Sequence, residues 1–133
     1  MNICISDFPR IAPENEDGPR WRRAMDSMTE GGVLIGEVTE YVIATTITIK
    51  PNVTILGLGN GRFHRGTTFK YTGTGSTFNF NKVTAGIKLL NFKITTGEED
   101  SNYQNFTGID VNSAELVTIQ DITITNAKAG IDC

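Results

Sequence analysis

The sequence contains little of what several protein classes require. Its 133 residues include two cysteines, Cys4 and Cys133, which lie too far apart in the chain for a disulfide framework, so we expect two buried thiols. Lys and Arg number 12 against 15 Asp and Glu, a formal charge of -3 that provides no basic surface for nucleic acid. No apolar run reaches membrane-spanning length, and the N-terminus lacks the regions of a signal peptide. These absences indicate one domain without nucleic-acid binding or membrane insertion.

Helical periodicity is confined to one segment, DGPRWRRAMDSMTEGG. Pro19 fits the first helical position, and Gly31 with Gly32 would end the helix. One apolar face repeats at helical spacing and consists of Trp21, Ala24, Met25 and Met28. Such a short, isolated helix must bury this face against strands, so we expect it to cap their end.

Apolar residues after Gly32 recur with the period of two that is typical of strands. The strand pattern also returns: Val117 follows Ile87 by 30 residues, and Ile87 follows Val53 by 34. A second series has spacings of 31 and 22 and begins at Phe78, Ile109 and Ile131. Because this recurrence favours strands that stack on the previous turn of the chain, we predict an all-β, single-stranded parallel β-helix of about four coils with one N-terminal capping α-helix.

The segments ISDF, GGVLIG and TITIKPNVTILGLGNG, in this order around the helix, resemble the N-terminal part of the pectate-lyase-like right-handed β-helix superfamily. The resemblance covers about residues 4–60 by motif and the rest by repeat texture. The segments SDFPR and ENEDGPRWRRAMD look most similar to phage tailspike or pre-neck appendage proteins and their prophage relatives. The resemblance implies an opening segment with the capping helix over residues 1–32, followed by coils over residues 33–133.

The resemblance implies a protein that binds or degrades a cell-surface polysaccharide, with this chain mainly structural. The alternative is a polysaccharide lyase or glycoside hydrolase acting on an acidic glycan. By analogy, the protein would be a homo-oligomer, a trimer, in a virion tail or encoded by a prophage, or else exported without a signal peptide. No cofactor is expected in this chain, although calcium is compatible with a longer parent protein.

Two carboxylates are the strongest candidates for catalysis. Alternation along the predicted strands directs Asp110 and Asp132 outward on adjacent coils, about 5 Å apart. Such a pair could act as the acid and nucleophile of a glycosidase, share a cation, or form a solvated face near Lys128.

Candidate substrate-binding residues fall in two loops. Arg62 and Arg65 lie in the loop GNGRFHRGTT and could contact an acidic sugar, while His64 could transfer a proton. The alternative for this loop is a solvated turn. In the insertion TTGEEDSNYQNFTG, either Tyr103 or Phe106 could stack on a sugar, and we expect one of them to anchor the loop instead.

Three acidic residues of the insertion, Glu98, Glu99 and Asp100, lack the ligand spacing of a calcium loop, so no metal site is predicted. Asn126 suits a sharp bend between strands or an ordinary turn. The sequence stops at Cys133, at a predicted inward position. We therefore expect further coils in a longer parent protein, and association of this chain through its C-terminal end.

Overall fold

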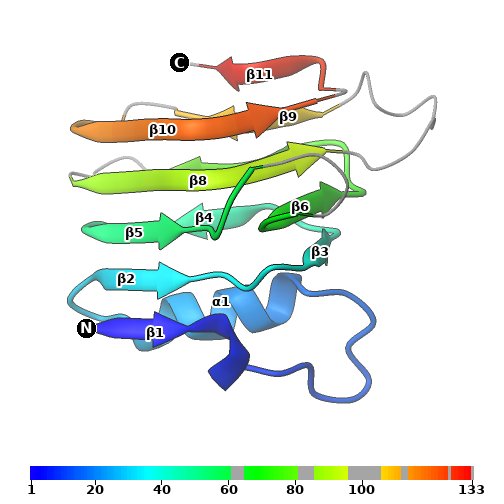
Figure 1. Cartoon of the computed structure of the whole chain (residues 1–133), viewed down its shortest axis with the longest axis vertical. Coiled ribbons are helices and arrows are strands. Elements are labelled where there is room, and N and C mark those ends of the chain that lie inside the picture. Colours follow the sequence, from blue (N-terminus) through cyan, green and yellow to red (C-terminus); the bar gives the residue numbers. More distant parts are fainter. Residues whose placement is uncertain (61–64, 81–85, 96–105, 112–113, 126, 133) are drawn as a thin grey trace.

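The computed structural model describes residues 1–60, 65–80, 86–95, 106–111, 114–125 and 127–132. Within these ranges the chain forms eleven strands, one α-helix and one 3-10 helix (Figure 1). The elements are β1 (Asn2–Cys4), η1 (Ile5–Asp7), α1 (Gly18–Ser27), β2 (Gly32–Ile35), β3 (Glu40–Ile43), β4 (Ile47–Ile49), β5 (Val53–Leu56), β6 (Thr68–Tyr71), β7 (Ser76–Phe80), β8 (Ile87–Thr95), β9 (Thr107–Asp110), β10 (Val117–Ile124) and β11 (Ala129–Asp132).

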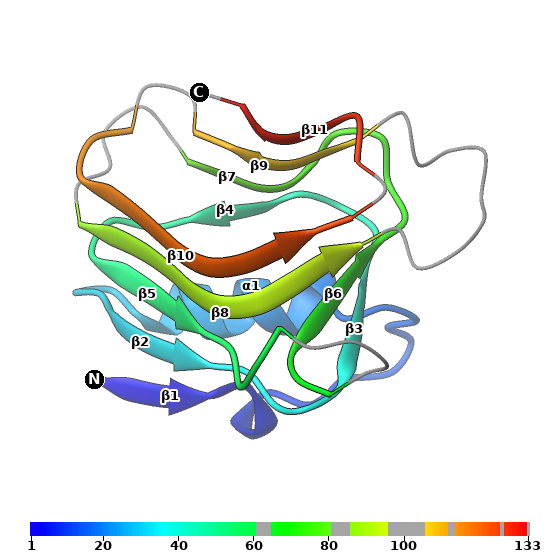
Figure 2. The ribbon, with the colours of Figure 1, turned by 45° about the horizontal axis from the view of Figure 1, so that its top comes forward.

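The strands form two sheets around a common core. The seven-stranded sheet has the order β1-β2-β5-β8-β6-β3, with β10 paired to β8, and the four-stranded sheet has the order β11-β9-β7-β4. Every pairing between these strands is parallel. Figure 2 shows the two sheets curling toward each other. Their parallel strands lie in successive layers, called the stack below, and α1 lies at the end of this stack near the N-terminus (Figure 1).

The predicted strand pairings are confirmed. Ile87 pairs with Val117, as the spacing of 30 residues required. Phe78 pairs with Ile109, which in turn pairs with Ile131. Equivalent apolar residues therefore lie above one another, and unequal loop lengths between the strands do not change this register.

One corner of the stack depends on left-handed backbone. Gly31, Asn52, Gly86 and Leu116 each directly precede a strand, namely β2, β5, β8 and β10, and have φ of 84°, 60°, 78° and 55°. A Cβ at Gly86 would lie 2.7 Å from Asn52 Oδ1, so the column is also tightly spaced. Glycine and asparagine tolerate this conformation, whereas leucine does not. The backbone at Leu116 is therefore strained.

A second corner lies inside two strands. Asn91 in β8 and Asp121 in β10 have φ of 63° and 56° and so bend their strands midway. The first half of β8 pairs with β5 and its second half with β6. The bend thus joins two groups of strands into one continuous curled sheet. Sequence reasoning missed both residues, although asparagine and aspartate are the side chains most tolerant of this conformation.

The predicted all-β, single-stranded β-helix of about four coils was wrong. The structure is instead a half-barrel of two parallel sheets, of seven and four strands, with α1 packed into its core. The difference arises because β8 and β10 each continue through a corner where separate short strands were expected. The opening segment also contributes β1, which pairs with β2 and was not predicted.

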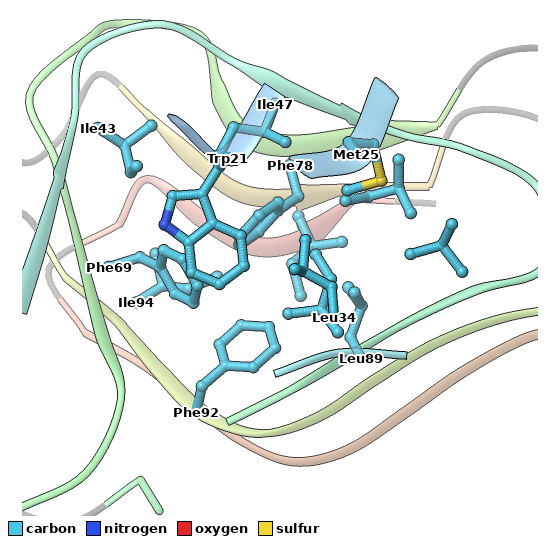
Figure 3. Packing of buried hydrophobic residues seen from close by; sticks show 14 of the residues in the cluster. Trp21, Met25, Leu34, Ile43, Ile47, Phe69, Phe78, Leu89, Phe92 and Ile94 are labelled. Carbon is cyan, nitrogen blue, oxygen red and sulfur yellow. The ribbon is translucent and has the colours of Figure 1, made fainter. Parts of the chain in front are cut away.

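The predicted helix is confirmed, with Asp17 as its N-cap and proline in its first turn. Trp21, Met25 and Met28 are at most 2% exposed, and α1 contacts β4. The centroid of the Trp21 ring lies 5.1 Å from that of Tyr41 and 4.9 Å from that of Phe69, in edge-to-face contacts. Figure 3 shows Trp21 beside Phe69. These aromatic contacts attach the helix to the core of the seven-stranded sheet.

Replacing Trp21 with alanine should lower the free energy of unfolding by about 3–5 kcal/mol, because the ring is completely buried between the helix and the sheet. Urea denaturation followed by circular dichroism measures this change. Asp26→Ala on the same helix is a suitable control, since its side chain is 73% exposed and should cost about 1 kcal/mol or less. Equal losses in the two variants would contradict the proposed packing.

Replacing Leu116 with asparagine should raise the free energy of unfolding by about 1 kcal/mol, because asparagine tolerates the left-handed conformation that leucine resists. The Leu116 side chain is 77% exposed, so little packing is lost. Leu58→Asn provides the control, since Leu58 is 49% exposed but is not among the residues with positive φ. A gain in the control alone would show that backbone strain at Leu116 is unimportant.

Candidate functional site

A column of polar side chains crosses the four-stranded sheet. Thr48 on β4, Asn79 on β7, Asp110 on β9 and Asp132 on β11 occupy successive register positions. The Thr48 hydroxyl donates a hydrogen bond of 2.7 Å to Asn79 Oδ1. None of the four is fully buried, whereas their neighbours Ile49, Phe78 and Ile109 belong to the core. The column therefore lies on the outer face of the sheet.

Asp110 and Asp132 are paired in register, as predicted. Neighbouring strands are separated by about 4.8 Å, so the two carboxylates can approach the separation of about 5–5.5 Å that retaining glycosidases use. Asp110 is half-buried and Asp132 is exposed. Among the described residues, neither carboxylate forms an ion pair with Lys128, which is itself exposed. The pair can accept hydrogen bonds from a ligand, and its strands position it.

The loop predicted to bind substrate is fixed at its base. Asn60 and Gly66 form an antiparallel bridge, and Asn60 Nδ2 donates a hydrogen bond of 2.9 Å to the carbonyl oxygen of Asp121 on β10. Arg65 is exposed at the end of this loop. Arg62 and His64 lie outside the described residues. The structure therefore places one of the predicted arginines on the surface beside the bend of β10.

The predicted anchor of the long insertion is confirmed at Phe106. This residue is 1% exposed, and its ring centroid lies 5.5 Å from that of Tyr71. Tyr103, the predicted sugar-stacking residue, lies outside the described residues, as do Asn126, Cys133 and the acidic run from position 98 to 100. Phe106 is thus part of the core.

A network of ion pairs and hydrogen bonds around Asp17 lies in the opening segment, and the sequence analysis did not predict it. Asp17 is 4% exposed and receives two hydrogen bonds from Arg10, of 2.9 and 3.1 Å. Arg20 lies 3.5 Å from Asp17 and donates hydrogen bonds to the carbonyl oxygens of Ile5 and Phe8. The alternation of carboxylates and arginines in ENEDGPRWRR was the available signal.

This network also covers the edge of β3. The backbone of Asp17 donates to the Val42 carbonyl at 2.6 Å, and its carboxylate accepts from the Val42 N–H at 2.7 Å. The Glu16 carboxylate accepts from the N–H of Ala44 at 3.0 Å. Because β3 ends the path of the seven-stranded sheet, these groups take the place of a neighbouring strand.

Burial alone would raise the pKa of Asp17, but the hydrogen bonds from Arg10 and Val42, together with the charges of Arg10 and Arg20, hold it below its ordinary value of 3.8. Burial raises the pKa of the Tyr41 phenol. This phenol accepts a hydrogen bond from the Glu37 N–H and lies 3.3 Å from the Glu37 carboxylate. Both groups therefore keep one protonation state near neutral pH and stabilise the fold.

Cys4 is partly exposed and accepts a hydrogen bond of 3.1 Å from the Ser6 hydroxyl, so the prediction of a buried thiol is wrong there. In the described ranges, no three His, Cys, Asp or Glu side chains gather as metal ligands. No helix in those ranges is long and apolar enough to cross a bilayer.

Solved structures with a similar fold include a viral protein and a bacterial protein. ORF18 of Geobacillus virus E2 is 17% identical, with a TM-score of 0.72 over 91% of this chain and 25% of that protein. A protein from Parabacteroides merdae, provisionally described as a glycosyl hydrolase, is 14% identical, with a TM-score of 0.60 over 96% of this chain and 76% of that protein. No protein-family profile and no curated protein matches the sequence.

These comparisons correct the resemblance drawn from sequence motifs. The chain is similar to a viral protein and to a provisionally described glycosyl hydrolase, and membership of the pectate-lyase-like superfamily is not supported. At 17% and 14% identity, the likeness shows the fold alone. The chain spans about a quarter of the length of the viral protein.

The ion pair at Asp17 should make stability depend on acid pH. Because the pKa of this carboxyl is lower in the folded chain than in the unfolded chain, its stabilisation is complete above the unfolded value and is lost as pH falls through the folded value. Thermal unfolding from pH 7 to pH 2 should therefore show Asp17→Asn less stable than wild type at neutral pH, with the two curves converging in acid.

Asp26→Asn is the control for this experiment, because its carboxylate is 73% exposed and pairs only with Lys50 among the described residues. It should follow the wild-type profile. A constant difference between wild type and Asp17→Asn across the whole pH range would contradict the assignment of acid sensitivity to Asp17.

Proposed function

We propose that this chain is a structural module of a phage or prophage-encoded appendage protein, of the tailspike kind, that acts on a cell-surface polysaccharide. One observation carries the proposal. All six ion pairs among the described residues contact the opening segment or α1. The ion pairs among the described residues therefore stabilise the fold.

The viral fold neighbour supports the phage context of this proposal. The glycosyl hydrolase description of the second neighbour supports a role connected with carbohydrate. In the proposed role, Arg65 contributes to the capture of an acidic glycan. Arg62 and Tyr103, the other residues predicted to bind substrate, lie outside the described residues.

A polysaccharide lyase or glycoside hydrolase is the second candidate, favoured by the register of Asp110 with Asp132. One carboxylate would protonate the leaving oxygen and the other would act as nucleophile. Against this role, Asp132 is exposed on the last strand of its sheet, with no charged partner among the described residues. A general acid requires an environment that favours its protonated form, and burial commonly provides it.

The structural and the enzymatic candidate functions differ in whether this chain cleaves a polysaccharide. The 133-residue chain should yield neither unsaturated products nor new reducing ends from polygalacturonate, alginate or wall teichoic acid, because no charged group among the described residues supports the pair as catalysis requires. Ultraviolet absorbance and a reducing-end assay measure these products. Turnover that is abolished in both Asp110→Asn and Asp132→Asn would instead establish the enzyme.

Glycan capture has its own test. Native gels containing each polysaccharide should retard the wild-type chain, and Arg65→Ala should weaken this retardation. Lys88→Ala is the matched control, because Lys88 is also an exposed cation but lies on β8 away from the loop. Equal weakening in both variants would indicate general attraction to a polyanion, and no retardation of wild type would refute capture by this chain.

A further inference from the structure

The cations among the described residues fall into two groups. The first group forms ion pairs with carboxylates, and it consists of Arg10, Arg20, Arg22, Arg23 and Lys50. The second group forms no ion pair within the described ranges, and it consists of Arg65, Lys70, Lys88, Lys93 and Lys128. In a chain with a formal charge of -3, the second group provides the cations that a negatively charged ligand can use.

Lys70 and Lys93 differ in burial from the rest of the second group. Both are half-buried, whereas Arg65, Lys88 and Lys128 are exposed. Packing already restricts a half-buried side chain, so binding an anion costs it less conformational entropy than it costs an exposed lysine. These two lysines are therefore better prepared for a ligand than the exposed cations.

The register of β6 and β8 brings Lys70 and Lys93 together. Lys93 on β8 pairs with Thr68 on β6, and Lys70 lies two residues beyond Thr68 on the same strand. Phe69 and Ile94 are register partners in the core, so the alternation of side chains directs both lysines to the outer face. Diagonal neighbours on adjacent strands have Cα atoms about 7–8 Å apart, a gap that two long lysine side chains can span to reach one anion.

Arg65 lies close to the same part of the sheet. The backbone N–H of Lys93 donates a hydrogen bond of 2.9 Å to the carbonyl oxygen of Thr67, which follows Arg65 by two residues. The base of the Arg65 loop is also attached to β10 through Asn60. The fold therefore gathers an exposed arginine and two half-buried lysines around β6.

Glu40 is the carboxylate that the register places beside this pair of lysines. It lies on β3 and pairs with Thr68, so it is a diagonal neighbour of Lys70. Glu40 and Lys70 nevertheless form no ion pair among the described residues. Strand β6 lies between Glu40 and Lys93. Both ammonium groups are thus available to an anion from outside the chain.

We propose that Lys70 and Lys93 form an anion-binding site on the outer face of β6 and β8, which binds one carboxylate or phosphate group of an acidic polysaccharide. Charge complementarity supports this ligand, because two ammonium groups can donate to two oxygens of either group. A polymer that also contacts Arg65 presents several charges to the same face, and linked contacts strengthen one another. The inference rests on the glycan capture proposed above and names the residues that bind the charged group.

Affinity electrophoresis at increasing polymer concentrations tests the site. Lys70→Gln/Lys93→Gln should raise the apparent Kd about tenfold or more, because two charge-assisted hydrogen bonds are lost. The matched control, Lys88→Gln/Lys128→Gln, removes the same charge from two exposed lysines and should change the Kd about twofold or less. Lys70→Arg/Lys93→Arg keeps both positive charges and should retain binding.

Three polymers identify the bound group. Polygalacturonate carries carboxylates, wall teichoic acid carries phosphates and dextran is uncharged. The acidic polymer whose retardation depends on Lys70 and Lys93 identifies the source of the anion, and dextran should retard none of the variants. Retardation by dextran as strong as that by the acidic polymers would overturn the proposal, since the contact would then not depend on charge.

The outcomes separate this site from the proposed function. Circular dichroism establishes that each variant remains folded, and the two single variants replace the glutamine double variant if it unfolds. Retardation that Arg65→Ala weakens and Lys70→Gln/Lys93→Gln does not would overturn the site while capture through Arg65 stands. Equal weakening by the two glutamine double variants would also overturn the site. No retardation of the wild-type chain would refute glycan capture itself, and the site with it.

Discussion

Parallel stacking requires the chain to return to the same register at each layer, and the left-handed corners make this return possible. Four residues with positive φ precede β2, β5, β8 and β10, and two more bend β8 and β10 in their interiors. Because each corner lies above the previous one, inward side chains from distant parts of the sequence meet in a single core. The positions of the aromatic cluster, the polar column and the surface loops all depend on this register.

The two ends of the stack are stabilised in different ways. At the N-terminal end, Trp21 fills the core and the Asp17 carboxylate replaces a neighbouring strand at the edge of β3. This combination satisfies buried backbone groups and covers apolar surface with one short segment. At the β10 end, the described residues provide neither kind of cover. The two ends of the stack of strands therefore differ from each other.

The outer faces carry the groups available for recognition. Asp110 and Asp132 are aligned by strand register, while Arg65 extends from a loop attached to β10 through Asn60. A rigid stack with variable loops is a suitable scaffold for ligand contacts, because the loops change without disturbing the core. The similarity to a viral protein and to a provisionally described glycosyl hydrolase shows the fold alone, and function depends on the groups that the fold presents.

The sequence by itself determined the helix, most of the strands and the partners in the repeated pairings, because apolar periodicity and its recurrence are local properties of the chain. It also aligned Asp110 with Asp132 and indicated that one aromatic residue would anchor the insertion. Only the tertiary structure decided how strands join into sheets, because the bends at Asn91 and Asp121 are backbone angles that residue types permit but do not require. It likewise decided the role of Asp17, whose carboxylate meets Val42, 25 residues away in the chain, only after the helix docks on the sheet.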